Sequence, residues 1–410
     1  MSDTYYLAER FKPPVAPPVD AERFVRRDAR GYLYAVDHRV YLDQTVHTAE
    51  MERVFRQQWV FVGMELEVSE PGSFKTTHFG DVPVVIVRDE QGALHVYENI
   101  CIHRGAVLVR KQCGKARALE CLYHRWAYNL KGSLIGVPMP GKFPASFKKQ
   151  DFKLAELPRV ETFSGMIFAS YRKDIEPLLD YLGDVKPYVE DVLNKGKIEF
   201  LGHQRYHVKA NWKLFIENTV DGYHPALLHT MIFAEKEYEY EPAKGESRKF
   251  SNGHGYLQWP ASARPAHVDE TENMPLAFTR TRKTPEWDYS INLFPNVMVL
   301  RIADIITVRQ LIPRGLERVD VITSNFALAG ESEELKRHRA WMVSGQFGSA
   351  GVASLDDKFA MESVQEAARA RYSDTLLLRG EYKNGVGELT TETTLRGFYE
   401  KWVECVGSQR

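Results

Sequence analysis

Two short cysteine–histidine pairs lie in the first third of the chain, at Cys101-x-His103 and Cys121-x-x-His124, with seventeen residues between them. Thiolates and imidazoles both bind transition metals, and pairs on two adjacent loops can bring four ligands to one centre. A structural zinc site would hold all four in a tetrahedron, whereas a mixed-ligand [2Fe-2S] cluster would take the thiolates on one iron and the imidazoles on the other. The ligand types alone do not decide between zinc and an iron–sulfur cluster.

A second group of candidate ligands occupies the stretch "NWKLFIENTVDGYHPALLH". Asn218, Asp221 and His224 recur every three residues, which predicts one ridge of a helix. Pro225 disfavours helical geometry at His224 and can start a new helical segment, so His224 and His229 can converge without regular helical spacing. A lone histidine in such a stretch would usually pack or cap, but the set as a whole indicates chemistry. Two histidines and one carboxylate form the facial triad of non-haem iron(II) oxygenases.

The elements that must position these residues differ along the chain. A short helical stretch near residue 48 is followed by apolar runs of period two, which indicate an all-β domain. "VPVVIVRDEQGALHVYEN" predicts a hairpin that turns at Gln91-Gly92, and "SGMIFASY" predicts the last strand of this block. The first motif therefore lies on hairpin loops. Zinc fingers with two cysteines and two histidines usually sit in a small ββα unit with other spacings, so the all-β setting favours the iron cluster.

Beyond residue 172 the apolar spacing becomes helical, and later strands and terminal helices follow. We place a domain boundary there. A helix is expected to begin near Asn211, and "SLDDKFAMESVQ" predicts another helix with Asp356 and Asp357 at its start, where one of them would serve as the N-cap.

Composition excludes several classes of protein. The 54 Lys and Arg nearly balance the 55 Asp and Glu of this 410-residue chain, so no global field recruits nucleic acid or an anionic membrane. The first twenty residues carry charges and prolines where a signal peptide needs an apolar core, and no run approaches a membrane span in length. We therefore expect a cytoplasmic protein. Its four cysteines are too few for a disulfide framework and are free to bind metal.

The flanking residues carry a family resemblance. "CIHRGA" and "CLYHRWAYNLKGSL" resemble the two cluster loops of Rieske non-haem iron oxygenases, although Arg125 stands where the family often has glycine. Residues 211–229 independently resemble the catalytic helix of the large (alpha) subunit of these aromatic-ring-hydroxylating oxygenases. The two matches follow the family's order along most of the chain.

The resemblance implies cofactors and their ligands. One Rieske [2Fe-2S] cluster per subunit would be held by the four residues of the first motif, and one mononuclear Fe(II) per subunit by His224, His229 and a distant carboxylate. The family's third ligand is usually the second acidic residue of a pair, which selects Asp357 and leaves Asp356 as the N-cap. Asp221 would be the carboxylate that bridges the two metal centres, and Asn218 would lie near the iron.

The resemblance also implies the architecture and the partners. We expect an α+β protein with an N-terminal arm (1–44), an all-β Rieske domain (45–172) and a helix-grip catalytic domain (173–410), in which helices cover an antiparallel sheet. No glycine-rich dinucleotide fingerprint follows a strand, so electrons from NADH or NADPH must arrive through a partner reductase, with or without a ferredoxin. A trimer of large subunits is implied, with or without a small beta subunit.

The expected substrate is a small aromatic ring together with O2. "TVRQLIP" and "TETTLRGFY" resemble segments of the terephthalate and salicylate oxygenases, so Arg309 and Arg396 are candidate anchors for an aromatic carboxylate. For either arginine, an ordinary salt bridge is an equally good interpretation. The expected reaction is cis-dihydroxylation by a dioxygenase, and the alternative is monooxygenation by ring hydroxylation or oxidative dealkylation. A protein of another class, a Rieske electron carrier without oxygenase activity, would hold no mononuclear iron.

Overall fold

The computed structural model describes residues 16–27, 34–230, 244–261, 264–265, 279–280, 287–370, 374–377, 379–380 and 384–407. The chain divides into two compact units, the first comprising Met1–Ala16 and Phe55–Leu178, and the second comprising Pro17–Val54 and Leu179–Arg410. The proline-bearing start of the predicted arm lies mostly outside the described residues. The division near 178 follows the change from period-two to helical spacing in the sequence.

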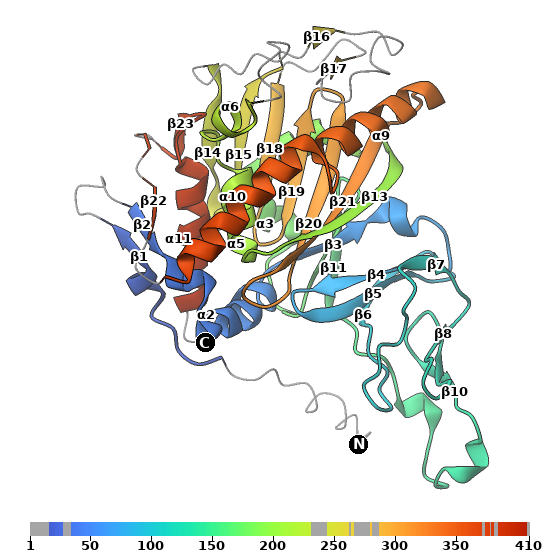
Figure 1. Ribbon diagram of the computed structural model, residues 1–410. Coiled ribbons are helices and arrows are strands. Elements are labelled where there is room, and N and C mark those ends of the chain that lie inside the picture. The colour runs from blue at the N-terminus through green and yellow to red at the C-terminus, as the bar shows by residue number, and fades with distance from the viewer. Residues whose placement is uncertain are drawn as a thin grey trace. The chain divides into compact units, whose positions relative to one another are not determined.

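The first unit consists of antiparallel strands (Figure 1). One sheet has the order β6-β5-β4-β7, a second β11-β12-β3 and a third β10-β9-β8. The predicted hairpin is present as β5 and β6, and its turn is fixed by Asp89, whose carboxylate accepts the N–H groups of Gln91 and Ala93 while Gly92 takes a positive φ of 85°. The strands are β3 (Val60–Met64), β4 (Ser73–Phe79), β5 (Val82–Arg88), β6 (Leu94–Glu98), β7 (Cys113–Lys115), β8 (Leu119–Glu120), β9 (Ala127–Tyr128), β10 (Leu134–Gly136), β11 (Arg159–Phe163) and β12 (Met166–Ser170).

An eight-stranded antiparallel sheet forms the centre of the second unit, in the order β13-β21-β20-β19-β18-β15-β14-β23. Its strands are β13 (Ile198–Val208), β14 (Glu246–Lys249), β15 (Gly255–Pro260), β18 (Trp287–Leu293), β19 (Val297–Ile302), β20 (Ile305–Pro313), β21 (Val319–Leu328) and β23 (Val386–Glu388). Smaller sheets are made by β1 (Val25–Arg27), β2 (Tyr34–Asp37) and β22 (Asp374–Leu376), and by β16 (Arg264–Pro265) and β17 (Thr279–Arg280).

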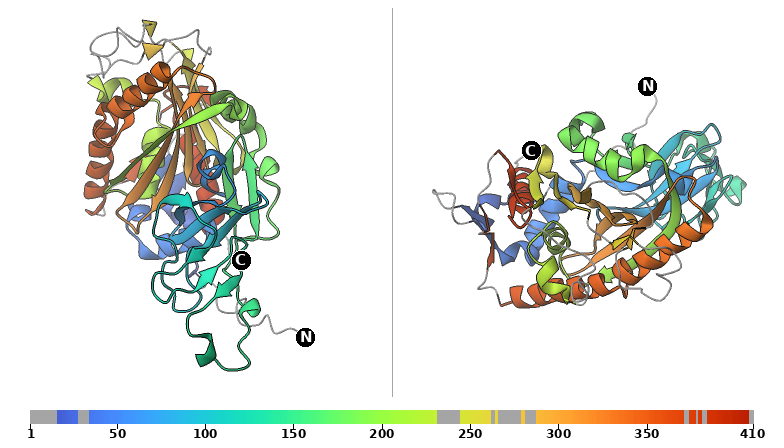
Figure 2. Two further views of the ribbon diagram at one scale, coloured as in Figure 1. Left: turned by 90° about the vertical axis from the view of Figure 1, so that its right-hand side faces the viewer. Right: turned by 90° about the horizontal axis from the view of Figure 1, so that it is seen from above.

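Helices α9 and α10 run diagonally across this sheet, and α11 packs along β14 and β15 (Figure 1; Figure 2, right). The α-helices of the described residues are α2 (Gln44–Ala49), α3 (Leu178–Leu182), α4 (Lys186–Val192), α5 (Trp212–Thr219), α6 (Pro225–Leu228), α9 (Glu333–Phe347), α10 (Val352–Ala368) and α11 (Thr393–Gly407). Among the described residues, no helix combines the length and the apolar character needed to cross a bilayer. The arrangement is the predicted α+β fold with helices covering an antiparallel sheet.

The two faces of the large sheet carry different helices. On one face Arg301 of β19 donates to Asp191 of α4, at 2.6 Å from Nη2 to Oδ2. On the other face the Ser290 hydroxyl donates to the backbone carbonyl of Thr219 at the end of α5, and the sulfur of Met298 lies 2.6 Å from the Thr219 hydroxyl. Because side chains alternate along each strand, Arg309 of β20, which pairs directly with Met298, belongs to the α5 face.

A buried ionic cluster ties residue 50 to the second unit. Glu50 is fully buried, and its carboxylate accepts hydrogen bonds from the Lys213 ammonium at 2.7 Å and from the indoles of Trp212 and Trp402 at 3.0 and 2.7 Å. These contacts join the segment after α2 to α5 and α11, so a buried charge is fully paired and hydrogen-bonded. The short helix near residue 48, which we expected to open the Rieske domain, therefore lies in the second unit.

Candidate metal centres

The two cysteine–histidine loops of the first unit have the same backbone pattern. The Cys101 N–H donates to the Ala106 carbonyl at 2.8 Å, and the Cys121 N–H donates to the Trp126 carbonyl at 2.9 Å. In each loop the cysteine carbonyl accepts a second bond from the residue four positions on, Gly105 in one loop and Arg125 in the other, at 2.9 Å. The loops are thus closed locally by their own amides, so each presents its cysteine and histidine in the same way.

Closure requires a left-handed residue at the fourth position after each cysteine. Gly105 has a φ of 71° and Arg125 a φ of 54°. Arginine therefore adopts the conformation that glycine would adopt without strain, and its guanidinium pairs with Glu120 at 2.7 Å on the surface. The departure from the family pattern at residue 125 leaves the shape of the loop unchanged.

We predict that a substitution at Gly105 lowers the stability of the protein, whereas a glycine at position 125 leaves it almost unchanged. A Cβ at Gly105 would meet no atom within 4 Å, so the cost of Gly105→Ala is only the left-handed backbone, about 1 kcal/mol. Arg125→Gly removes that strain and a solvent-exposed ion pair, two small effects of opposite sign, so its stability should stay within about 0.5 kcal/mol of the parent. Denaturation midpoints followed by the visible absorption of the cluster measure both. Loss of the cluster in Arg125→Gly would contradict this account and assign the guanidinium a role in assembly.

The four side chains of the first motif converge. Both cysteines are buried, the centroids of the His103 and His124 rings lie 4.6 Å apart, and His103 stacks on Trp126 with centroids 4.7 Å apart and planes 3° from parallel. Tyr128, which sequence analysis did not single out, places its hydroxyl 3.3 Å from the Cys101 sulfur. A hydrogen bond to a cluster sulfur is one of the features that set the reduction potential of iron–sulfur centres.

These residues fit a mixed-ligand iron–sulfur cluster. The Nδ1 atom of His103 is buried and has no hydrogen-bond partner among the described residues, as expected of an atom reserved for metal. Burial, with the nearby His124 and Arg104, lowers the pKa of His103 and so favours the neutral ring that metal binding needs. Burial raises the pKa of the Cys101 thiol, so ligation must displace its proton.

In the second unit, α5 begins as the sequence predicts and ends earlier than expected. The Asn211 side chain accepts the Lys213 N–H and caps the first turn. The helix stops at Thr219, so Asn218, Asp221 and His224 do not form one helical ridge. His224 itself has helical dihedral angles, φ −74° and ψ −31°, just before α6 begins at Pro225, so the helical geometry that Pro225 was expected to disfavour is present at this residue.

Three side chains from distant parts of the chain nevertheless meet at one point. The Nε2 atoms of His224 and His229 lie 3.4 and 3.3 Å from the same oxygen, Oδ1 of Asp357 on α10. One ligand atom from each residue lies within 4.8 Å of the others. Asn218 donates to the same Asp357 oxygen at 3.1 Å. Two imidazole nitrogens and one carboxylate oxygen in this arrangement are the donor set of a facial triad.

Each histidine is oriented by a second carboxylate. The Nδ1 atom of His224 lies 3.2 Å from Oδ2 of Asp221, and Nδ1 of His229 lies 3.2 Å from Oδ2 of Asp356. A proton on each Nδ1 leaves the lone pair of Nε2 for the metal. The expected N-cap role of Asp356 was wrong, because α10 already begins at Val352 and Asp356 lies in its second turn.

The electrostatics of this group suit a dication. Burial raises the pKa of Asp357, but the hydrogen bonds and charges of His224 and His229 outweigh it and hold that pKa well below its usual range. Burial lowers the pKa of His224, but its bonds to Asp221 and Asp357 prevail and raise the value to about 9. Asp357 is therefore ionised at neutral pH, and a bound iron would take the place of the proton that His224 otherwise holds.

The two candidate anchor arginines lie in different surroundings. Arg309 is 5% exposed, its guanidinium carbon lies 4.7 Å from the centre of the Phe347 ring, and its Nε and Nη2 atoms have no hydrogen-bond partner among the described residues. Arg396 on α11 is also buried, but its Nη2 donates to the Leu377 carbonyl at 2.7 Å and its guanidinium lies over the Tyr34 ring. Of the two, Arg309 has the greater unused hydrogen-bonding capacity.

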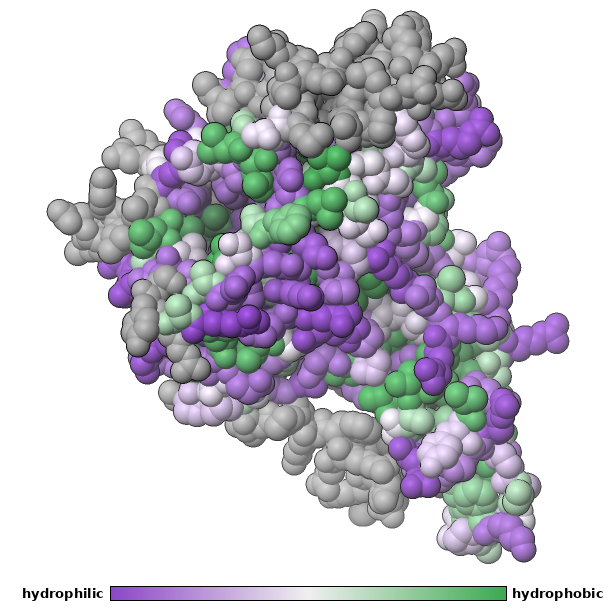
Figure 3. Space-filling model, in the orientation of Figure 1, coloured by the Kyte–Doolittle hydropathy of each residue, from purple (hydrophilic) through white to green (hydrophobic). Residues whose placement is uncertain are grey.

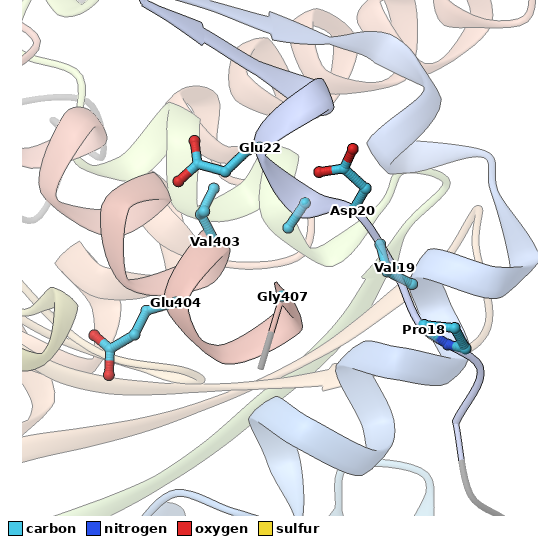
Figure 4. A pocket seen from close by; sticks show the side chains of 8 residues that line it. Pro18, Val19, Asp20, Glu22, Val403, Glu404 and Gly407 are labelled. Carbon is cyan, nitrogen blue, oxygen red and sulfur yellow. The ribbon is translucent and has the colours of Figure 1, made fainter. Parts of the chain in front are cut away.

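A cavity of about 630 Å³ lies between the end of α11 and the segment that precedes β1 (Figure 4). Asp20 and Glu22 approach it from that segment and Glu404 from α11. None of the triad residues lines it, and it carries no evident ligand chemistry beyond exposed carboxylates.

Comparisons with known proteins agree with both centres. Residues 58–161 match the Rieske [2Fe-2S] domain family, and residues 197–408 match the catalytic domain of the ring hydroxylating alpha subunits. The chain belongs to the ring-hydroxylating alpha subunit family. It is 30% identical over 396 residues to the large oxygenase component of salicylate 5-hydroxylase from Ralstonia sp, covering 90% of this chain and 93% of that protein. It is also 30% identical over 406 residues to the large subunit of anthranilate 1,2-dioxygenase from Burkholderia cepacia, covering 91% and 93%.

The solved structure of naphthalene 1,2-dioxygenase with indole bound in the active site has the same fold, with a TM-score of 0.82, 24% identity and 95% of each chain covered. As a ring-hydroxylating alpha subunit, the protein is an oxidoreductase with a Rieske [2Fe-2S] cluster and a mononuclear iron as its cofactors. It is the terminal oxygenase of a multicomponent system and needs an electron-donating reductase or ferredoxin.

Proposed function

We propose that this ring-hydroxylating alpha subunit oxidises the ring of a small aromatic carboxylic acid. The observation that carries the proposal is the convergence of His224, His229 and Asp357 on one point in the second unit. When bound there, iron supplies O2 activation, and the residues supply its ligands and their orientation. The relatives named for salicylate and anthranilate, both aromatic acids, support the choice of substrate class.

Arg309 is the proposed anchor for the substrate carboxylate. It lies on the sheet face that also carries Met298, whose sulfur contacts the last residue of α5. A buried guanidinium with two free nitrogens costs free energy unless an anion pairs with it, and a carboxylate can accept two parallel hydrogen bonds from it. The acid would then be held at one end while its ring faces the iron.

The proposed reaction is cis-dihydroxylation, in line with the relative named anthranilate 1,2-dioxygenase. The relative named salicylate 5-hydroxylase favours ring hydroxylation as the second candidate. The position of the ring relative to the iron decides between them, since both reactions use the same ligands and O2.

The assembly is proposed by family resemblance. Three alpha subunits would form a ring, with or without a beta subunit, so that Asp221 faces His124 of the partner subunit. In the isolated chain Oδ2 of Asp221 holds His224, and Oδ1 accepts the Tyr223 N–H at 2.7 Å. Each carboxylate oxygen has two lone pairs, so Oδ1 can accept one further bond from an imidazole.

Turnover with a compatible reductase tests the proposal. We expect about three irons and two acid-labile sulfides per chain. Oxygen uptake should be coupled to product with salicylate, anthranilate, benzoate or terephthalate, and mass spectrometry shows whether one or two oxygen atoms enter. A chain with two irons, two sulfides and no coupled uptake would be an electron carrier instead.

Arg309→Gln tests the anchor in the same assay. Loss of a charge-assisted hydrogen bond is worth about 1.5–3 kcal/mol, so KM for the acids should rise roughly 10- to 150-fold while uptake with a neutral ring changes little. The matched control is Arg396→Gln, which should lower stability through its lost bond to Leu377 and leave KM unchanged. The reverse result would make Arg396 the anchor.

A further inference from the structure

Buried polar side chains lie beside Arg309 on the face of the large sheet that carries α5. Strands β20 and β21 pair so that Thr307 lies directly opposite Asn325, and Arg309 lies directly opposite Thr323. Side chains two residues apart on a strand point to the same face, so all four belong to the face of Arg309. Each of them is at most 6% exposed. The proposed carboxylate anchor therefore has a second polar pair in the neighbouring row of the sheet.

The side chains of Thr307 and Asn325 contain hydrogen-bonding atoms that the protein does not use. Within the described residues, the hydroxyl oxygen of Thr307 and Oδ1 of Asn325 are buried and have no hydrogen-bond partner. Most buried side-chain polar atoms are paired, because an unpaired atom loses its bonds to water and gains none. Two unpaired atoms on directly opposed residues, one row from an arginine with two unpaired nitrogens, indicate a site for the polar groups of a ligand.

This polar row leads toward the end of α5. Leu300 pairs with Thr307 on one side and with Ser290 on the other, so the three side chains form one row across β20, β19 and β18. The Ser290 hydroxyl donates to the carbonyl of Thr219, the last residue of α5, at 2.8 Å. The preceding residue, Asn218, is the one that donates to the carboxylate of the facial triad. A ring held along this row therefore lies on the side of the sheet that faces the triad.

Tyr206 of β13 provides a second link between Arg309 and the triad. Burial raises the pKa of its phenol, the Arg309 guanidinium opposes that shift, and the Asp357 carboxylate adds to it. The effect of a charge on a pKa weakens with distance, so both charges lie near this phenol. The proposed anchor and an iron ligand are thus close enough to act on one side chain.

Apolar side chains border the polar row. Leu300, which pairs directly with Thr307, belongs to a buried apolar cluster. Phe347 of α9 belongs to the same cluster, and the centre of its ring lies 4.7 Å from the guanidinium carbon of Arg309. Helices α9 and α10 cover this part of the sheet (Figure 1), and Figure 3, in the same orientation, shows hydrophilic residues over much of the outer surface. A few buried polar groups among apolar ones are typical of sites that bind small molecules.

We infer that Thr307 and Asn325 recognise a hydroxyl or amino group on the ring of the aromatic acid whose carboxylate Arg309 holds. The inference rests on the proposed function and narrows its substrate class. Oδ1 of Asn325 can only accept a hydrogen bond, whereas the Thr307 hydroxyl can donate or accept one. A ring hydroxyl or amine can donate to Asn325 and form its second bond with Thr307, so both buried atoms become paired. An unsubstituted acid leaves both atoms unpaired and is bound less tightly.

The test uses variants of the full-length holoenzyme that change hydrogen bonding with little change in volume. Asn325→Leu and Thr307→Val remove the two atoms, and Thr307→Ser keeps the hydroxyl. The matched control is Ser324→Ala, because Ser324 adjoins Asn325 but lies on the opposite face of the sheet, 3.2 Å from Nδ1 of His203. The probes are benzoate and the three isomers each of hydroxybenzoate and aminobenzoate. Calorimetry on the oxidised protein gives Kd without turnover, and coupled oxygen uptake gives kcat/KM.

The measured quantity is the preference for each substituted acid over benzoate, as a ratio of Kd values and as a ratio of kcat/KM values. In Asn325→Leu and in Thr307→Val the preference for the best isomer should fall about 2- to 12-fold, the value of one neutral hydrogen bond. Thr307→Ser and Ser324→Ala should keep the parental preference. The series that loses more shows whether a hydroxyl or an amine is recognised. An unchanged preference for every isomer in both variants would overturn the inference, even if stability fell, because the two side chains would then serve only the fold.

The proposed function can fail separately. If the parent oxidises none of the acids, the proposed function is refuted, and the calorimetric preference still decides whether Thr307 and Asn325 recognise the ring substituent. If the parent oxidises the acids but neither variant changes its preference, only recognition by these two residues is refuted.

Discussion

Asp357→Ala is expected to abolish turnover and mononuclear iron binding while leaving the Rieske cluster in place. Asp357 supplies the one carboxylate oxygen that both His224 and His229 face, at 3.4 and 3.3 Å. Without it, two imidazoles remain with no anionic ligand. Changing a residue that only orients a ligand typically costs 10- to 100-fold in metal affinity, so loss of the ligand itself should exceed about 100-fold. The cluster should persist because its four proposed ligands all belong to the first unit.

Iron titration of the metal-depleted protein measures this effect, with the visible spectrum of the Rieske cluster as the internal control. Asp356→Asn is the matched variant, because it changes the neighbouring carboxylate, whose Oδ2 lies 3.2 Å from Nδ1 of His229. We expect an intermediate loss, about 10- to 100-fold in iron affinity. If Asp357→Ala bound iron as tightly as the parent, the third ligand would have to be another group.

The features that the sequence predicted well depend on short-range chemistry. Each cluster loop is closed by amides within six residues, so the spacing of Cys101, His103, Cys121 and His124 already contains its geometry. The strand hairpin at residues 82–99 was likewise recognisable, because Asp89 and Gly92 fix its turn locally. The change in apolar period predicted an all-β block followed by helices, whereas the α+β architecture with a helix-grip domain was implied by the family resemblance.

Features that depend on contacts between distant residues were missed. Nothing near Asp356 shows that its carboxylate meets His229, 127 residues away, and a pair of aspartates is equally consistent with a cap. Glu50 could be assigned to the second unit only once Lys213 and Trp402 were seen around it. A single sequence records which residues are available for such contacts but not which of them meet.

Residues of the segment that carries His224 and His229 also have structural uses that spacing does not reveal. Glu217 accepts hydrogen bonds from the hydroxyls of Tyr41 and Tyr399, and burial raises its pKa to about 7 despite them. Glu217 therefore joins α5 to α11 through Tyr399, and to the segment before α2 through Tyr41. Its neighbour Asn218 instead contacts Asp357, so two adjacent residues of one motif serve packing and the metal site respectively.

Asp221→Asn should reduce substrate oxidation about 100-fold when it is measured with enough iron to keep both metal centres loaded. Asn keeps the size of the side chain, and its Oδ1 can still accept the Tyr223 N–H. Its amide nitrogen would then face Nδ1 of His224 at 3.2 Å, donor against donor, and the negative charge between the two proposed redox partners would be lost. The imidazole would lose its orienting bond, and the route from the partner subunit's His124 would lose its acceptor.

The structure provides a control that separates these two effects. Asp356→Asn makes the same chemical change at the same distance, 3.2 Å, from Nδ1 of the other histidine ligand. If orientation of an imidazole is all that Asp221 contributes, the two variants should lose iron affinity and turnover alike. If Asp221 also links the centres, only Asp221→Asn should show a reduced Rieske cluster that reoxidises slowly under oxygen with an aromatic acid bound. Rapid-mixing absorbance and product yield in one turnover distinguish the cases, and parental reoxidation in Asp221→Asn would leave Asp221 an orienting role only.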